Sequence, residues 1–166
     1  MSWISPKVTR KASPNKGFGL FASENLCQGE LICVTVGKVL TTEEALFHPM
    51  PYHCFQIELN LQLAPMDLNS LTGIFTTNHS CEPNAGLRNG IALVAMRGIR
   101  AGEEICFDYV MSDCTMGLIP TVSMECKCGT KSCRGTITDT DWRDPVLQGK
   151  YQGYFSLYLA EILKGN

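Results

Sequence analysis

The 166-residue sequence has little charge, no long apolar run and no internal repeat, and each shortage excludes a class of protein. Charged residues make up 18% of the chain and apolar residues 45%, a balance that argues against intrinsic disorder. The formal net charge of −2 lacks the basic footprint of a nucleic-acid-binding protein. No stretch approaches the length of a membrane span. We therefore expect one globular domain with at most a small appendage, and no direct contact with nucleic acid or a membrane.

The chain also lacks the apolar core of a secretory signal peptide, because it opens with MSWISPKVTRK. We therefore expect an intracellular setting, cytoplasmic or nuclear, in which thiols stay reduced. What the chain does have is nine cysteines. In a reducing compartment, clustered cysteines indicate metal ligands or reactive thiols before they indicate disulfides.

Helical periodicity is scarce over most of the chain, and short strand-like runs take its place. Four runs are rich in β-branched or alternating apolar residues, and they cover 31–41, 54–65, 91–99 and 103–110. The turn sequences RNG and RAGE flank the third run and predict tight connections between antiparallel strands. A short helix is expected over 41–47, with Thr41 or Thr42 as its N-cap.

The C-terminal residues carry the clearest helical pattern. Over 144–166 apolar side chains recur at helical spacing, although Gly149 and Gly153 weaken the start of the pattern. The spaced residues are Leu147, Tyr151, Tyr154, Phe155, Tyr158, Leu159 and Ile162. We interpret this helix as packing on the domain, and the alternative is a cap over a ligand groove.

The stretch CKCGTKSC places Cys126, Cys128 and Cys133 at C-x-C-x4-C spacing. Three thiolates this close suit a tetrahedral zinc site, whose fourth ligand must come from elsewhere, and Cys81 is a candidate. Free surface cysteines and a redox loop are alternatives, although the spacing is not C-x-x-C. Basic side chains that can offset the thiolate charge are Lys127, Lys131 and Arg134. The remaining cysteines are predicted to be small core residues: Cys27, Cys33, Cys54, Cys106 and Cys114.

Three further motifs carry useful polar groups, but each alone has an ordinary structural explanation. NHSCEPN, residues 78–84, places polar side chains between two apolar runs. KGFG, residues 16–19, allows close backbone approach to a ligand, yet a plain turn explains it equally well, and it lacks the third glycine of a dinucleotide fingerprint. FDY, residues 107–109, ends a strand, where tyrosine is usually half-buried packing. His48 and His53 are expected at the surface or in loops.

Together and in this order, Gly-x-Gly, NHSCEPN, GEEICFDY and C-x-C-x4-C resemble the SET-domain protein lysine methyltransferases. The resemblance covers about residues 8–135. It implies a mostly-β fold, the SET β-clip, in which the polar heptad lies at a pseudoknot and Asn84 ties the crossing together. It also implies a SET domain over 1–112, a post-SET zinc-binding segment over 113–136, and a C-terminal extension over 137–166 that is expected to be helical.

The resemblance further implies the residues of a site. Those expected to bind the methyl donor, S-adenosylmethionine, are Lys16, Gly17, Phe18, Gly19, Tyr52, Asn78, His79 and Tyr109. Tyr109 would be the catalytic tyrosine at the methyl-transfer channel, and Phe107 would leave that channel room for more than one methyl group. The ligands of one structural zinc ion would be Cys81, Cys126, Cys128 and Cys133. A cationic donor and a desolvated channel both lower the pKa of the target lysine, so no dedicated base is required.

The expected activity is methylation of lysine side chains in a protein substrate, such as a histone tail or another basic protein. Two departures from the family pattern bear on this expectation. Many members have tyrosine where this chain has Thr35 and glutamate where it has Lys38. Many also carry an aromatic residue just before a Ser-Pro turn, where this chain reads VTRKASP, residues 8–14. A catalytically inactive SET fold that binds peptide or donor, and a plain zinc-stabilised interaction module, are the alternatives.

Overall fold

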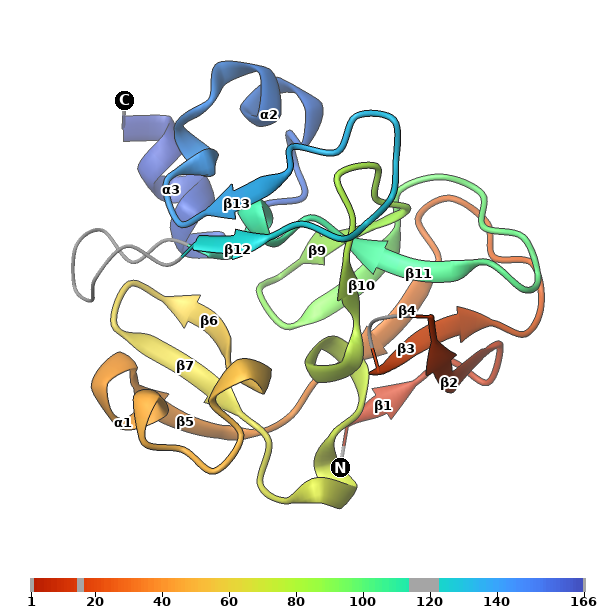
Figure 1. Ribbon diagram of the computed structural model, residues 1–166, viewed down its shortest axis with the longest axis horizontal. Coiled ribbons are helices and arrows are strands. Elements are labelled where there is room, and N and C mark those ends of the chain that lie inside the picture. The colour runs from red at the N-terminus through yellow and green to blue at the C-terminus, as the bar shows by residue number, and fades with distance from the viewer. Residues whose placement is uncertain (1, 15–16, 114–122, 166) are drawn as a thin grey trace.

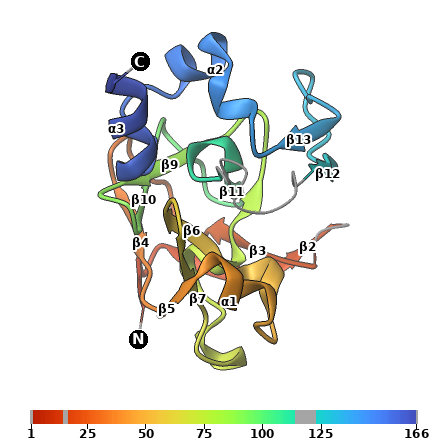
Figure 2. The same ribbon diagram turned by 90° about the vertical axis from the view of Figure 1, so that its left-hand side faces the viewer.

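The fold is mostly β, as the motifs implied. The computed structural model describes residues 2–14, 17–113 and 123–165, drawn in Figure 1 and, after a quarter turn, in Figure 2. Its strands are β1 (Trp3–Ile4), β2 (Val8–Ser13), β3 (Gly17–Ala22), β4 (Leu31–Val34), β5 (Lys38–Thr41), β6 (Phe55–Glu58), β7 (Leu61–Ala64), β8 (Asn78–His79), β9 (Ala85–Arg88), β10 (Ala92–Ala95), β11 (Glu104–Phe107), β12 (Ser123–Glu125) and β13 (Thr136–Thr138). Its α-helices are α1 (Thr42–Leu46), α2 (Pro145–Lys150) and α3 (Leu157–Gly165), and short 3₁₀ helices cover Pro51–His53, Leu68–Ser70, Gly73–Thr76, Tyr109–Met111 and Asp141–Arg143. None of the helices in these ranges is long and apolar enough to cross a membrane.

The strands form four small sheets. Two are four-stranded, in the orders β1-β4-β10-β9 and β2-β3-β11-β8, while β5-β7-β6 form a third sheet and β12 pairs with β13. Among the described strands the pairing is antiparallel except that β8 runs parallel to β11, which sets Asn78 beside Cys106 and His79 beside Phe107. The polar heptad therefore begins next to the strand that carries the FDY motif.

The two predicted tight turns have different outcomes. RNG does join β9 to β10 in a tight three-residue connection, in which Asn89 has φ 53° and Gly90 φ 80°, left-handed conformations that asparagine and glycine tolerate best. The prediction for RAGE is wrong, although Gly102 does turn the chain with φ 89°. β10 already has β4 and β9 on its two sides, so the chain crosses to the other sheet, where β11 pairs with β3 and β8.

Two of the runs that were predicted as single strands each form two strands in the structure. The run 31–41 divides at Gly37 into β4 and β5, which belong to different sheets. A Cβ atom on Gly37 would lie 2.4 Å from a carbonyl oxygen of β7, so the backbone passes too close there for any side chain. The run 54–65 folds back as the hairpin β6–β7, in which Phe55 lies opposite Leu63. Paired residues share a face, so the alternation continues across the turn and periodicity does not reveal it.

The short helix predicted over 41–47 is confirmed as α1, and its N-cap is Thr41. The Thr41 hydroxyl accepts a hydrogen bond from the Glu44 amide at 3.2 Å, and the Glu44 carboxylate accepts one from the Thr41 amide at 2.7 Å. This reciprocal capping box fixes the start of the helix. The chain then turns through the 3₁₀ helix Pro51–His53, which carries two residues of the site described below.

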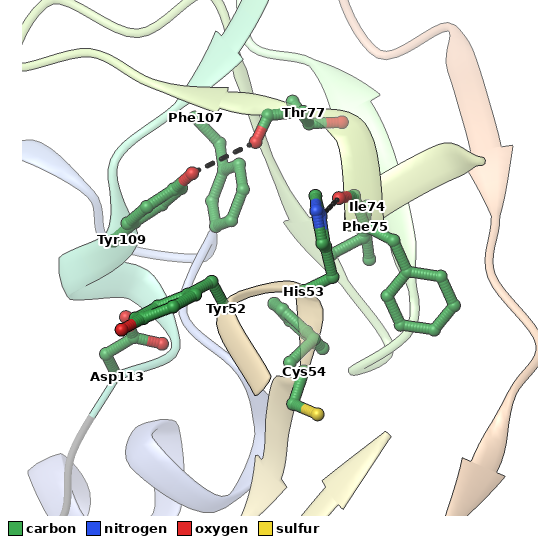
Figure 3. A pocket seen from close by; sticks show the side chains of 10 residues that line it. Tyr52, His53, Cys54, Ile74, Phe75, Thr77, Phe107, Tyr109 and Asp113 are labelled. Carbon is green, nitrogen blue, oxygen red and sulfur yellow. Dashed lines mark hydrogen bonds between the residues drawn. The ribbon is translucent and has the colours of Figure 1, made fainter. Parts of the chain in front are cut away.

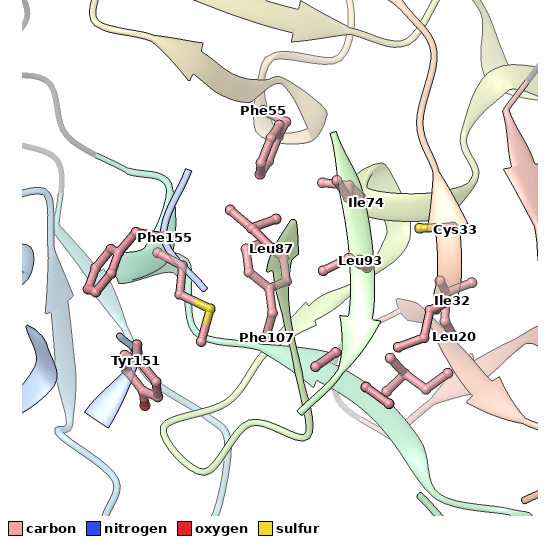
Figure 4. Packing of buried hydrophobic residues seen from close by; sticks show 14 of the residues in the cluster. Leu20, Ile32, Cys33, Phe55, Ile74, Leu87, Leu93, Phe107, Tyr151 and Phe155 are labelled. Carbon is pink, nitrogen blue, oxygen red and sulfur yellow. The ribbon is translucent and has the colours of Figure 1, made fainter. Parts of the chain in front are cut away.

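The C-terminal pattern forms two helices instead of the single predicted one. Gly153, with φ 84°, turns the chain between α2 and α3. Tyr151 and Phe155 are buried in the main hydrophobic cluster, which Figure 4 shows extending from these tail residues to Leu20 and Ile32. The tail therefore packs on the domain, which was the favoured interpretation of its apolar spacing.

The cysteines outside the cluster motif are not all core residues. Cys33 and Cys106 are buried and Cys54 is half-buried. The prediction for Cys27 is wrong, because this residue is exposed in the turn ahead of β4, where its amide donates to the Glu30 carboxylate at 2.9 Å. Cys114 lies outside the described residues.

Asn84 closes the polar heptad against β11. Its side-chain NH₂ donates to the Glu104 carbonyl at 2.8 Å, and its side-chain oxygen accepts from the Cys106 amide at 2.9 Å. Its backbone N–H donates to the Cys106 carbonyl at 3.2 Å, and its carbonyl accepts from the Met96 amide at 2.8 Å. One buried asparagine thus ties the heptad both to β11 and to the chain after β10.

Asn84→Ala is expected to lower the free energy of unfolding by about 2–4 kcal/mol, because two buried backbone groups of β11 lose their partners. Urea denaturation measures the change. Asn69→Ala, at an exposed position, is the matched control and should change stability by less than about 0.5 kcal/mol. Equal effects of the two substitutions would contradict the role given to Asn84.

Candidate active site and metal centre

A small cavity of about 100 Å³ opens beside the end of β11 (Figure 3). Its walls are mostly aromatic or aliphatic, with a few polar groups. The lining residues are Tyr52, His53, Cys54, Phe55, Ile74, Phe75, Thr77, Phe107, Tyr109 and Asp113. We name this cavity the channel. Its shape and lining suit an unbranched, mainly apolar side chain with a polar end, such as that of lysine.

Tyr109 is held in the channel by the chain that follows β11. The Asp108 side chain caps the 3₁₀ helix that starts at Tyr109, and the Tyr109 hydroxyl donates to the Thr77 carbonyl at 3.3 Å. The centroids of the Phe107 and Tyr109 rings are 5.0 Å apart. Burial raises the pKa of Tyr109 above its usual range, so the hydroxyl stays protonated at physiological pH and can orient a reactant by hydrogen bonding.

A second cavity, of about 420 Å³, shares Tyr109 with the channel and is also lined by Gly17, Phe18 and Asn78. The Asn78 side-chain NH₂ donates to the Phe18 carbonyl at 3.1 Å and to the Glu104 carboxylate at 2.7 Å. These bonds hold the start of β3 against β8. With Tyr52, which also lines it, the structure therefore brings five of the predicted donor-binding residues to one cavity, and that cavity meets the channel at Tyr109.

The two glycines of the KGFG motif are needed for different reasons. Gly17 adopts φ 75°, a left-handed conformation that favours glycine. A Cβ atom on Gly19 would lie 2.4 Å from Glu104 Oε1 and 2.8 Å from Asn78 Nδ2, so only glycine lets β3 pass this close to the asparagine. Lys16, the first residue of the motif, lies outside the described residues.

Tyr52 and His79 occupy contrasting positions. The Tyr52 side chain is 98% exposed yet lines both the channel and the second cavity, which places it at their mouth. His79 is buried and lines a further cavity between the heptad and β12, together with Asn78 and Cys128.

Potential metal ligands gather where the heptad meets the cysteine-rich stretch. The ligand atoms of His79, Cys81, Cys126 and Cys128 all lie within 4.8 Å of one another. The Cys81 and Cys126 sulfur atoms are 3.7 Å apart. Two sulfur ligands of a tetrahedral zinc ion, with Zn–S bonds of about 2.3 Å, would be about 3.8 Å apart. Cys133 packs on the same cluster, with its Sγ 3.8 Å from the Cys126 carbonyl oxygen, so the donors present fit zinc.

The thiols of this cluster differ in acidity. Burial raises the pKa of Cys81 and of Cys126 above the usual range. Although burial acts in the same sense on Cys128, its pKa is lowered to about 6 by hydrogen bonds, among them one with the Thr130 hydroxyl at 3.2 Å.

Comparison with known proteins agrees with these features. The family model of the SET domain matches residues 17–110, more than half of the chain. The chain belongs to the SET-domain family. The histone-lysine N-methyltransferases ash1 and Su(var)3-9 of Drosophila melanogaster are each 29% identical to it, over 90% and 80% of this chain. Histone-lysine N-methyltransferase SUV39H1-A of Danio rerio is 29% identical over 75% of it. The matched regions are 7%, 25% and 39% of those proteins, so the chain spans well under half the length of each.

In this SET domain His79 links the cysteine cluster to Tyr109. Its Nδ1 lies 3.3 Å from the Tyr109 amide nitrogen, which donates to it, and 3.5 Å from Asp108 Oδ1. Nε2 lies 3.4 Å from Cys81 Sγ, and a protonated nitrogen there donates to sulfur and cannot ligate a metal. The group of ligand atoms that lie within 4.8 Å of one another includes His79 and not Cys133, so the structure does not bring Cys133 into the same close set.

A buried carboxylate joins the FDY motif, the cysteine-rich stretch and the tail. Asp108 accepts two hydrogen bonds from the Arg134 guanidinium, at 2.6 and 2.8 Å, and one from the Tyr151 hydroxyl at 2.9 Å. The Arg134 amide donates to Cys81 Sγ at 3.4 Å, and Lys150 Nζ donates to the Cys81 carbonyl at 2.8 Å. The hydrogen bonds to Asp108 raise the pKa of Arg134. The Arg134 guanidinium therefore pairs with the Asp108 carboxylate. The sequence had suggested instead that Arg134 offsets the negative charge of the cysteine thiolates.

Thr35, one of the departures from the family pattern, lies behind the channel wall. It is buried, its hydroxyl accepts a hydrogen bond from the Ile74 amide at 3.0 Å, and it does not line the channel. Gly73 lies against it with φ 62°, where a Cβ atom would be 2.6 Å from the Thr35 hydroxyl. Thr35 therefore supports the 3₁₀ helix Gly73–Thr76, which forms part of the channel.

Sequence reasoning missed two polar residues of the channel. His53, expected only at the surface or in a loop, is half-buried with its Nδ1 2.8 Å from the Phe75 carbonyl oxygen. The Asp113 carboxylate accepts a hydrogen bond from the Ser112 hydroxyl at 3.0 Å. No motif marks either residue, because each reaches the channel from a segment that has no signature of its own.

Arg134→Met is expected to lower the free energy of unfolding by about 3–5 kcal/mol, because Asp108 would stay buried without its counter-charge. Urea denaturation measures the loss. Arg97→Met is the matched control, because Arg97 forms an exposed pair with Glu103 at 3.1 Å, and it should cost less than about 1 kcal/mol.

The double variant Asp108→Asn/Arg134→Met should be more stable than Arg134→Met alone, since it removes the buried charge as well. If the double variant is less stable by the sum of two independent losses, the ion pair is not what holds these segments together.

Proposed function

We propose that the chain transfers methyl groups from S-adenosylmethionine to lysine side chains of a protein substrate. The observation that carries the proposal is that two cavities meet at Tyr109. One is small and has several aromatic side chains in its wall, and the other is lined by Gly17, Phe18 and Asn78. Membership of the SET-domain family supports it, as do relatives that are named histone-lysine N-methyltransferases.

The chemistry asks the chain mainly to position the reactants. Methyl transfer from a sulfonium to an amine is an in-line displacement, so alignment supplies much of the rate. The Tyr109 hydroxyl and the Thr77 carbonyl would orient the amine and the methyl group. The Phe55 and Phe107 rings, 6.2 Å apart between centroids, would exclude water. Phe107 has no hydroxyl to hold a water molecule, and we propose that this leaves room for a second or third methyl group.

The donor would lie in the second cavity. The residues proposed to hold it are Lys16, Gly17, Phe18, Gly19, Tyr52, Asn78, His79 and Tyr109. Because the His79 ring already bonds to the Tyr109 amide and lies against Cys81, we propose that His79 contacts the donor through its backbone.

We propose that one structural zinc ion is held by Cys81, Cys126, Cys128 and Cys133. When bound, it would fix the cysteine-rich stretch against the heptad. His79 would then act as a hydrogen-bond donor to the Cys81 thiolate and carry the position of the cluster to the Tyr109 backbone.

The proposed substrate is a histone tail or another basic protein, on the printed names of the relatives, and the proposed setting is intracellular, cytoplasmic or nuclear. The division into 1–112, 113–136 and 137–166 stays a proposal of the same kind. The third part is not an independent unit, since its aromatic side chains belong to the main hydrophobic cluster.

Tyr109→Phe is expected to lower the rate of methyl transfer about 100-fold or more, because it removes the hydroxyl that orients the reactants. Tritiated S-adenosylmethionine with core histones as acceptors measures the rate, and calorimetry should show donor affinity within about threefold of wild type. Tyr154→Phe is the matched control, since Tyr154 packs on Gly86 and lines neither cavity.

The same experiment separates the alternatives. Donor binding with no labelled histone would favour a SET fold that has lost catalysis. No donor binding by metal-replete protein would leave a zinc-stabilised interaction module.

The purified protein is expected to contain one zinc ion per chain, measured by mass spectrometry. Cys126→Ser should lose the ion, whereas Cys27→Ser, at an exposed cysteine, should keep it. His79→Gln should also keep it, because the four thiolates are the proposed ligands. Loss of zinc in His79→Gln together with full zinc in Cys133→Ser would assign the ion to the other donor set.

A further inference from the structure

Asp113 is the one carboxylate among the described residues that line the channel. Its amide donates to the Tyr109 carbonyl at 2.8 Å, and its side chain accepts from the Ser112 hydroxyl at 3.0 Å. Figure 3 shows Asp113 next to Tyr52 on the same side of the channel as Tyr109, with His53 across from it. The acid is thus held in fixed register with the tyrosine at the reaction centre.

The same residue also borders a groove outside the channel. This groove, of about 240 Å³, lies between the β6–β7 hairpin and the β12–β13 hairpin, and Asp113 and Tyr109 line both spaces. No lysine or arginine is found among the described residues around either space. Asp113 therefore lies on a wall shared by the two spaces, and none of the described lining residues is a lysine or arginine that could neutralise it.

The surroundings of Asp113 favour its protonated form. Burial raises the pKa of its carboxyl to about 6, and the nearby Asp108 and Asp139 carboxylates act in the same sense, against the Ser112 hydrogen bond. Asp108 is itself paired with Arg134. The other titratable groups that share the channel with Asp113 are Tyr52, His53, Cys54 and Tyr109.

We propose that Asp113, in place of the base-free deprotonation that the family resemblance implied, accepts the proton of the incoming lysine ammonium and so produces the nucleophilic amine inside the channel. The inference rests on the proposed function. Lysine is protonated in water at neutral pH. An unpaired ammonium would be costly to bury between the Phe55 and Phe107 rings, and a carboxylate in the wall offsets that cost. Desolvation then makes the neutral pair of amine and carboxylic acid competitive with the ion pair.

The step balances as follows. One N–H bond of the ammonium breaks, its electron pair stays on nitrogen, and an O–H bond forms on Asp113. The amine then bonds to the methyl carbon of the sulfonium donor as the carbon–sulfur bond breaks, and that electron pair passes to sulfur. The product is a methylammonium and a neutral thioether. Asp113 returns to its carboxylate when its proton passes to water in the groove.

The test is the pH dependence of single-turnover methyl transfer from tritiated S-adenosylmethionine to core histones. Wild-type activity should fall as the pH drops through about 6, where Asp113 becomes protonated. Asp113→Asn should be about tenfold or more slower at pH 7. Its rate should rise about tenfold per pH unit toward the wild-type rate at high pH, because its substrate must lose the proton in solution. Asp113→Glu should recover part of the rate, and donor affinity should not change.

Glu43→Gln is the matched control, because Glu43 is exposed and lines neither the channel nor the groove, and it should keep the wild-type profile. An Asp113→Asn variant with the wild-type rate and profile would overturn the inference and leave the proposed function intact. Absence of label from wild-type protein at every pH would overturn the proposed function and the inference together.

Thermal unfolding gives a second measurement that needs no substrate. The pKa of Asp113 is raised in the folded state from its ordinary value of 3.8, so the carboxyl is least costly at low pH and destabilises the fold as the pH rises through about 6. Asp113→Asn should therefore unfold at a higher temperature than wild type at pH 7.5 and at nearly the same temperature at pH 4. Equal shifts at both pH values would show that the Asp113 carboxylate does not destabilise the fold, which would contradict the inference.

Discussion

The ion pair between Asp108 and Arg134 joins three parts of the chain that are distant in sequence. Asp108 follows β11, Arg134 follows the last cysteine of the cluster, and Tyr151 reaches the same carboxylate from the tail. A buried charge is costly unless it is both paired and hydrogen-bonded, so these segments stabilise one another only when all are in place. The residue next to Asp108 is Tyr109, and its position therefore depends on the cysteine-rich stretch and on the tail.

The cysteine cluster is coupled to the same point by a second route. His79 accepts from the Tyr109 amide and faces Cys81 Sγ, while Lys150 and the Arg134 amide bond to Cys81 from outside. A structural ion at the cluster would therefore act on Tyr109 through geometry, because it would fix sulfur atoms whose hydrogen-bond partners hold the backbone of that residue.

Asp113 places a carboxylate in a channel wall that is made mostly of aromatic and aliphatic residues. Phe55, Ile74 and Phe107 would pack against the stem of a lysine side chain, but a wall made only of such residues would oppose entry of its ammonium. The Asp113 carboxylate would offset the cost of bringing the ammonium into the channel, and at neutral pH it lowers the free energy of unfolding of the protein. Such a trade-off between stability and function is common where a site must hold a charge before its ligand arrives.

The parts of this protein that the sequence determined by itself depend on neighbouring residues. The RNG turn, the Thr41 capping box and the spacing of the last three cysteines are local patterns, and each formed where its residues predicted. The order of the motifs also identified the family.

Only the tertiary structure decided which distant segments meet. RAGE crosses between sheets because both sides of β10 are already paired, and the run 54–65 folds into a hairpin whose alternation looks the same as that of one strand. His53 and Asp113 entered the channel, and Arg134 paired with Asp108, through contacts that no local pattern encodes. The physical reason is that burial and charge pairing depend on which surfaces come together, and sequence spacing is silent on this once the partners are tens of residues apart.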